Sequence, residues 1–257
     1  MSMKVLSAAL AAALLIGGSS SAWRAGAEAT VPPYIAAAVA DPARPQADKD
    51  RDTARKPVEM LMFIKIKPGE KVVDFMPGPK GYFTKLFADV VGPTGHVYAF
   101  IPTEVAKFTK TTLPPNGAQI DSARPNVTAL VAPAKEFSTP EPVDIVWTSQ
   151  NYHDLHDPFM GPVDMADFDA AVFKSLKRGG IFVVLDHAAL SGSGVRDTNT
   201  LHRIDPAAVM GEVTSAGFKF VKETTVLRNP DDPHTALVFD PSIRGHTDQF
   251  VYLFRKP

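Results

Sequence analysis

A strand, a glycine-containing loop, a helix and a second strand follow one another within about 30 residues, and this order limits the chain to few folds. Lys71–Phe75 is an apolar run of strand length, and the loop after it contains Gly78 and Gly81. Residues 83–91 then carry apolar side chains at helical spacing, and His96–Ile101 is a second apolar run. This unit predicts two parallel strands joined by a right-handed crossover.

Strands and helices continue to alternate along the rest of the chain. Apolar runs predict strands at residues 127–131, 143–147 and 181–185. Asp164 and Asp205 are expected to cap two helices, the first of them closed by Gly179-Gly180, and two strand-like segments, 218–227 and 249–254, end the chain. The pattern predicts an α/β fold: a Rossmann-like, doubly wound, mostly parallel sheet of about seven strands with a C-terminal antiparallel hairpin.

The first 27 residues have the layout of a secretory signal peptide. Lys4 precedes an apolar run, Val5–Ile16, and the small residues Ala25–Ala27 offer a cleavage site, with Ser20–Ala22 as an alternative. The apolar run is shorter than the roughly 20 residues that a membrane-spanning helix needs. We therefore expect a periplasmic or secreted protein without a stable membrane span after cleavage, an uncleaved anchor being the alternative.

The chain is expected to have three parts. These are the signal peptide at 1–27, an N-terminal arm at 28–56 that is rich in Ala, Pro and then charged residues, and one domain at 57–257. The arm is expected to pack on the domain as a short arm or helix, with a mobile linker as the alternative because it has few large apolar residues. Nothing in it indicates a chemical role.

Charge and cysteine content exclude several classes of function. The chain has 27 Lys+Arg against 28 Asp+Glu, so it lacks the basic surface that nucleic-acid binding requires. It has no cysteine, which excludes thiol nucleophiles, zinc–thiolate sites and iron–sulfur ligation. The expected partner is a small-molecule substrate, and the oligomeric state is left open.

In an open parallel sheet, ligands bind beyond the carboxyl ends of the strands, where the strand order reverses. The loops there are residues 74–82, 101–104, 132–137, 148–157 and 186–205. In the first loop, Gly78 and Gly81 permit a tight turn and close approach of a ligand to the backbone. The standard dinucleotide and triphosphate motifs are both absent.

Several segments, taken in order, resemble the motifs of class I S-adenosylmethionine-dependent methyltransferases. They are the first strand and its loop, the second strand, the fourth strand and the approach to the fifth: Val72–Gly78 with Gly81–Thr84, Val91–Ala99, Val143–Val146 and Leu176–Val184. The whole chain is similar to a subgroup of exported bacterial proteins called predicted methyltransferases, through Asn151–His156, Leu201–Asp205 and Phe239–Phe250.

The resemblance implies S-adenosylmethionine as cofactor. It implies that Asp74, Gly78 and Gly81 line the methionine and ribose end of that cofactor. Glu104 is the nearest acid to the end of the second strand, where the family binds the ribose hydroxyls, and Glu136 stands where an acid often contacts the adenine amino group.

His153 is the preferred catalytic base, with Asp154 as the other candidate, because a neutral imidazole can accept a proton from an acceptor O–H or N–H. A locally hydrogen-bonded His–Asp cap is an equal alternative. The loops at the carboxyl ends of the strands, called the rim below, carry enough His and Asp for a zinc or iron site of two histidines and a carboxylate. We assign no metal, because the spacing of these residues is not diagnostic: His153, Asp154, His156, Asp157, Asp186, His187, His202 and Asp205.

The sequence thus predicts methyl transfer from S-adenosylmethionine to a small molecule. Two alternatives remain: an exported ligand-binding module that keeps the fold without catalysis, and a metal-assisted hydrolase that uses the His/Asp rim. The predicted signal peptide conflicts with the predicted cofactor, because an exported protein would act outside the cytoplasm, where S-adenosylmethionine is made.

Overall fold

The computed structural model describes Met1 and residues 30–257. The predicted signal peptide, residues 1–27, lies outside the described residues apart from Met1. The described chain forms seven strands: β1 Lys71–Phe75, β2 His96–Pro102, β3 Val127–Ala132, β4 Val143–Ser149, β5 Leu176–His187, β6 Lys219–Thr224 and β7 Gln249–Arg255. The α-helices within residues 30–257 are α1 Pro33–Ala40, α2 Gln46–Lys49, α3 Asp52–Arg55, α4 Pro57–Ile64, α5 Tyr82–Val91, α6 Thr103–Thr109, α7 Met165–Ser175, α8 Thr198–Leu201 and α9 Pro206–Ser215. Four short 3₁₀ turns are η1 Gly92–Thr94, η2 Ala134–Glu136, η3 His153–His156 and η4 Pro158–Met160.

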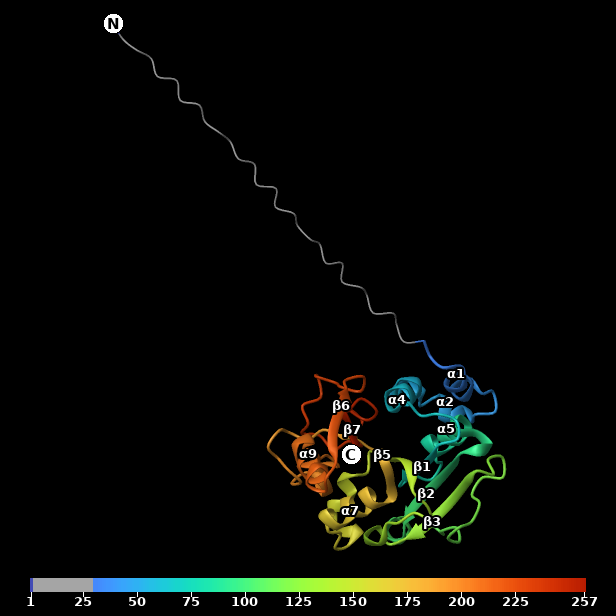
Figure 1. The fold of residues 1–257 in the computed structure, drawn as a ribbon. Helices are drawn as coiled ribbons and strands as arrows, with labels where there is room; N and C mark the ends of the chain where they lie inside the picture. The colour runs from blue at the N-terminus through green and yellow to red at the C-terminus, as the bar shows by residue number, and fades with distance from the viewer. Residues whose placement is uncertain (2–29) are drawn as a thin grey trace. The chain divides into compact units, whose positions relative to one another are not determined.

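The strands form one sheet in the order β3-β2-β1-β4-β5-β7-β6 (Figure 1). Strands β1 to β5 pair in parallel, and β7 lies antiparallel between β5 and β6. The predicted Rossmann-like sheet with a C-terminal antiparallel pair is therefore confirmed. Strand order reverses between β1 and β4, which places the expected ligand crevice at the carboxyl ends of these two strands.

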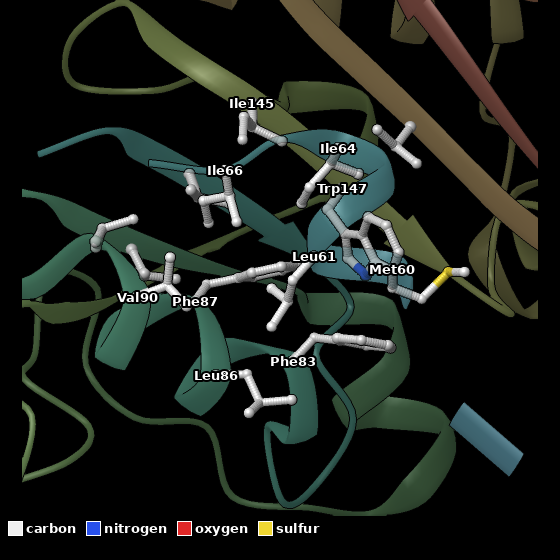
Figure 2. Close-up of a cluster of buried hydrophobic side chains, with 14 of the residues drawn as sticks. Met60, Leu61, Ile64, Ile66, Phe83, Leu86, Phe87, Val90, Ile145 and Trp147 are labelled. Carbon is white, nitrogen blue, oxygen red and sulfur yellow. The ribbon is translucent and has the colours of Figure 1, made fainter. Parts of the chain in front are cut away.

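Helices cover both faces of the sheet (Figure 1). On one face, α1, α4 and α5 bury their apolar sides against the strands. Trp147 of β4 is fully buried there, with its ring centroid 4.8 Å from that of Phe83 and 5.6 Å from that of Phe87 (Figure 2). Such burial of an aromatic residue contributes several kcal/mol in total, at about 25 cal/mol per Å² of apolar surface.

The other face of the sheet packs against α7 and α9. Phe75, at the end of β1, has its ring centroid 5.1 Å from that of Phe168 in α7. Asp164 caps α7, as predicted, by accepting hydrogen bonds from the backbone N–H groups of Ala166 and Asp167. The alternation of buried side chains along β1, with Val72 on one face and Val73 on the other, fixes the register of the central strand.

The N-terminal arm folds as α1, α2 and α3. Ile35 of α1 is 1% exposed and belongs to the core that α4 and α5 share. Arg44 forms an ion pair with Asp52 at 2.6 Å, and the Tyr82 hydroxyl donates to the same carboxylate, so the arm is held against the start of α5. No helix in residues 30–257 is both long enough and apolar enough to cross a bilayer.

One local prediction was wrong. The helix expected to close at Gly179-Gly180 ends at Ser175, and β5 already begins at Leu176. A Cβ on Gly180 would lie 2.9 Å from the carbonyl oxygen of Lys177 and 3.1 Å from that of Asp144. The glycine therefore serves the close approach of β5 to β4, where the register shifts, rather than a helix stop.

Candidate functional site

A cavity of about 510 Å³ lies at the carboxyl ends of β1 and β4. Its walls come from three segments: Ala47, Arg51 and Arg55 of the arm, Asp74 of β1 with Met76–Phe83 after it, and Ser149 at the end of β4 with Gln150, Asn151 and Asp154 after it. Cavities of about 300–1,000 Å³ hold cofactors and small ligands. The cavity occupies the point where strand order reverses, which is where the fold predicts a ligand.

Two strand ends meet at this cavity through Asn151. Its side-chain amide donates to the backbone carbonyls of Phe75 at 3.1 Å and Met76 at 2.9 Å, so the loop after β4 is tied to the end of β1. Met76 and Gln150 have positive φ angles of 53° and 62°, which only a few per cent of non-glycine residues adopt. Strained backbone of this kind is concentrated at functional sites.

Asp74 is one of two acids on the cavity wall, the other being Asp154. Burial raises its pKa from 3.8 to about 7, and the hydrogen bond from the Thr84 hydroxyl and the charge of Arg55 only partly oppose that rise. The carboxyl group therefore gains or loses its proton near neutral pH. A cationic ligand group beside it would favour the ionised form.

The arm supplies two arginines that the sequence analysis did not single out. Arg51 and Arg55 line the cavity, and their guanidinium carbons lie 5.3 and 5.8 Å from the ring centroid of Tyr82. Burial, together with the like charge of Arg51, lowers the pKa of Arg55 to about 10. The only sequence signal was their spacing of four residues in a charged run. That spacing is equally typical of a solvated helix face.

The predicted cofactor residues fall into two groups. Asp74, Gly78 and Gly81 all line the cavity, and Gly81, with a φ of 54°, starts α5 without a side-chain cap. Glu104 and Glu136 are not among the lining residues. The carboxylate of Glu104 accepts a hydrogen bond from the backbone N–H of Ala134 at 3.2 Å, and Glu136 is exposed.

The two candidate catalytic residues differ in their access to the cavity. Asp154 lines it, whereas His153 is 2% exposed and is not a lining residue. The Nδ1 atom of His153 lies 2.8 Å from the Oδ1 atom of Asp186, and its backbone N–H donates to the Oδ2 atom of the same residue. Asp154 lies beside the other ring nitrogen of His153, at 3.3 Å.

This environment sets the charge of His153. Burial alone would lower its pKa, but Asp186 and Asp154 outweigh burial and raise the pKa to about 10. The same pairing lowers the pKa of Asp154, against the effect of burial. The sequence analysis expected a neutral imidazole as base, whereas in this arrangement the protonated form of His153 is favoured near neutral pH.

The other His and Asp residues of the rim serve separate contacts. The ring of His187 pairs with the Thr247 hydroxyl at 2.7 Å, and His156 faces Glu212 at 3.3 Å. Asp205 caps α9, as predicted, by accepting from the backbone N–H of Ala207. Within residues 30–257, the three that converge closely enough to share a metal ion are His153, Asp154 and His202.

No protein-family model matches the sequence, and no curated protein matches it either. Solved structures do match. An S-adenosylmethionine-dependent methyltransferase from Aquifex aeolicus is 16% identical in sequence to this chain. The match has a TM-score of 0.51 and covers 82% of this chain and 97% of that one. The glycopeptide N-methyltransferase MtfA, complexed with sinefungin, is 15% identical, with a TM-score of 0.50 over 80% of this chain and 86% of that one.

The fold is that of class I methyltransferases. The [4+2]-cyclase SpnF has a similar structure, with 15% identity and a TM-score of 0.52 over 82% of this chain and 81% of that one. Likeness at this level of identity concerns the fold alone. The chemistry has to be argued from the cavity and the side chains around it.

Proposed function

We propose that this protein binds S-adenosylmethionine in the cavity at the ends of β1 and β4 and transfers its methyl group to a small molecule. The observation that carries the proposal is the position of the cavity. It lies at the reversal of strand order in a methyltransferase fold, and Asp74, Gly78 and Gly81 form its wall after β1. The sinefungin complex of the similar MtfA structure supports the choice of ligand.

The donors and acceptors around the cavity suit the amino-acid end of this cofactor. That end carries one carboxylate and one ammonium group. Arg51 and Arg55 offer guanidinium groups, which bind carboxylates through paired hydrogen bonds. Asp74 offers a buried carboxyl group for the ammonium, and the uncapped first turn of α5 presents backbone N–H groups nearby.

When bound, the cofactor supplies an electrophilic methyl group on a sulfonium centre. Asp154 stands on the cavity wall as an acceptor for the proton-bearing group of a substrate, and His153 behind it stabilises its negative charge. The half-buried arm residues Arg51 and Arg55 help to exclude water from the site. In this account, His153 acts through Asp154 rather than on the substrate.

A second candidate is a binding module that keeps the fold without methyl transfer. Glu104 favours it, because this nearest acid to the end of β2 is hydrogen-bonded to Ala134 instead of lining the cavity. SpnF supports the same point, since a protein of this fold is named as a cyclase. A module of this kind would bind S-adenosylmethionine or a related ligand without turning it over.

Calorimetric titration of the purified protein with S-adenosylmethionine and S-adenosylhomocysteine tests the proposal. We expect saturable binding of both at one site per chain. Replacing Arg55 by Gln removes a charged hydrogen-bonding group and is expected to weaken binding about tenfold to a hundredfold. The matched control is Arg196→Gln, because Arg196 lies on the surface and pairs with its neighbour Asp197. A folded protein that binds neither nucleoside would contradict the proposal.

We also propose that the chain is exported with cleavage near Ala27, which supports a periplasmic or secreted location. The basis is the signal-peptide pattern of residues 1–27. Mass spectrometry of the protein from a cell fractionation tests this. We expect a mature form that starts near Glu28 and is found outside the cytoplasm. A full-length form confined to the cytoplasm would contradict export. In that case the protein would have access to the S-adenosylmethionine made in the cytoplasm.

A further inference from the structure

Three side chains from two separate loops meet beside the cavity. The Nε2 atom of His153 lies 3.2 Å from the Nδ1 atom of His202 and 3.3 Å from the Oδ1 atom of Asp154. The remaining side of the triangle, from Nδ1 of His202 to Oδ1 of Asp154, is 3.7 Å. Two imidazole nitrogens and one carboxylate oxygen therefore converge on one point.

These separations fit a tetrahedral metal ion. Zinc binds histidine nitrogen and carboxylate oxygen at about 2.0–2.2 Å, and a tetrahedron with such bonds has ligand atoms about 3.3–3.5 Å apart. Two histidines and a carboxylate make up the protein ligands of one class of catalytic zinc site, which keeps its fourth position open. Imidazole nitrogens favour zinc and neighbouring transition metals over magnesium or calcium.

Asp186 orients the first histidine in the way that metal sites require. A metal-binding histidine usually donates its other ring N–H to a carboxylate, which fixes the tautomer and raises the basicity of the ligand nitrogen. In His153 the Nδ1 atom faces Asp186 at 2.8 Å, and this leaves Nε2 directed at His202 and Asp154. The Asp186 carboxylate is itself buried and also accepts the backbone N–H groups of His153 and His187.

The backbone at His202 is held in an unusual conformation. His202 follows α8 with a φ of 52°, in the left-handed region, and its ring packs against that of Phe239 at 5.0 Å. A non-glycine residue there costs on the order of 1 kcal/mol or more, which persists only where the surrounding structure enforces it. In this conformation Nδ1 of His202 lies 3.2 Å from Nε2 of His153 and 3.7 Å from Oδ1 of Asp154.

The cluster also has a surplus of buried negative charge. Asp157 is 1% exposed, and within residues 30–257 no hydrogen bond of normal geometry reaches either of its carboxylate oxygens. Buried carboxylates are normally paired with a cation or neutralised. A divalent ion bound by His153, Asp154 and His202 would place positive charge beside the carboxylate of Asp154 and close to that of Asp186.

We propose that His153, Asp154 and His202 bind a zinc ion, which takes the place of the proton on Nε2 of His153, with Asp186 as the residue that positions His153. The side chains of Asp154 and His202 are 15% and 28% exposed, so the cluster is open on one side. Asp154 also lines the cavity, so a ligand bound in the cavity would lie next to the ion and could occupy its open coordination position. An oxygen donor, such as a hydroxyl or carboxylate of a small molecule, is the group that this position would take.

Zinc binding by the purified full chain tests the proposal. After dialysis in a zinc-buffered solution near neutral pH, atomic emission should find one zinc per wild-type chain. His202→Asn and Asp154→Asn should each lower the affinity at least tenfold, and Asp186→Asn by about tenfold to a hundredfold. Substitution with cobalt should give the intense visible absorption bands of a tetrahedral site.

The control is His246→Asn, which removes an exposed histidine outside the cluster. It should bind zinc as the wild type does. Absence of stoichiometric zinc in the folded wild-type protein would overturn the proposal, as would His202→Asn and Asp154→Asn variants that bind as tightly as the wild type. Since S-adenosylhomocysteine binding is measured separately, failure of the metal site is distinguishable from failure of the proposed function.

Discussion

The Nδ1 atom of His153 lies 2.8 Å from the Oδ1 atom of Asp186, and both side chains are buried. His153 follows β4, whereas Asp186 lies within β5 near its carboxyl end, so this contact joins the loop after β4 to the neighbouring parallel strand. The pair fixes the orientation of the imidazole. It therefore decides where the other ring nitrogen points, toward Asp154 and the cavity.

Replacing Asp186 by Asn should destabilise the protein strongly. Breaking a buried charge pair by removal of one partner costs about 3–5 kcal/mol, because the other charge is left without compensation. We expect a loss at the lower end of this range, since Asp154 stays beside His153. Chemical denaturation measures it, with the exposed Asp231→Asn as the control, which should change the free energy of unfolding by less than about 0.5 kcal/mol. Equal effects of the two substitutions would refute the role given to Asp186.

The pH dependence of stability should report on Asp74. Its carboxyl ionises near 3.8 in the unfolded chain and near 7 in the folded one. Between these values the folded state holds a proton that the unfolded state has lost, so stability falls as pH rises through this window. Asp74→Asn should remove this decline and raise the free energy of unfolding at pH 8 by at most on the order of 4 kcal/mol, at 1.36 kcal/mol per pKa unit. At pH 4 the two proteins should be similar. Parallel pH profiles would show that Asp74 is not the group responsible.

A buried arginine anchors the insertion before β7. The side chains of Arg203 and Asp232 are both 0% exposed and form an ion pair at 2.8 Å. Arg203→Met should cost about 3–5 kcal/mol, because it leaves the Asp232 carboxylate buried without its partner. Adding Asp232→Asn should restore part of the loss, which a double-mutant cycle from denaturation curves measures. Strictly additive effects would mean that the two residues do not interact energetically.

Alanine substitution at two glycines should change the stability of the protein in opposite directions. A Cβ on Gly95 would lie 2.5 Å from the Cβ of Val91 and 2.6 Å from the carbonyl oxygen of Glu70. Gly95→Ala should therefore destabilise the protein by about 1–3 kcal/mol. Gly211 lies within α9 with no heavy atom within 4 Å of its added Cβ, so Gly211→Ala should stabilise by up to about 1 kcal/mol. Thermal unfolding of both variants checks the prediction, and a stable Gly95→Ala protein would refute it.

The fold could be predicted because its signals are local. The apolar run Lys71–Phe75, the helical spacing after Gly81 and the caps at Asp164 and Asp205 each report on a few neighbouring residues. The wrong helix end at Gly179-Gly180 shows the limit, since Gly180 is required by close contacts with the backbone of Lys177 and Asp144. Local sequence patterns carry no information about contacts between residues that are distant in the sequence.

The residues that line the candidate cavity could be predicted only where a single segment of the chain supplies them. Asp74, Gly78 and Gly81 stand together in one loop, and all of them line the cavity. Arg51 and Arg55 reach the cavity from the arm, and His202 reaches His153 across 49 residues. These approaches depend on tertiary packing and, at His202, on a left-handed backbone conformation that no motif encodes.

A crystal structure of the protein grown with S-adenosylhomocysteine tests the central claim most directly. The account predicts electron density for the ligand in the cavity at the ends of β1 and β4, with its amino-acid end between Arg55 and Asp74. Ligand density at another place, with the cavity filled by solvent alone, would contradict it.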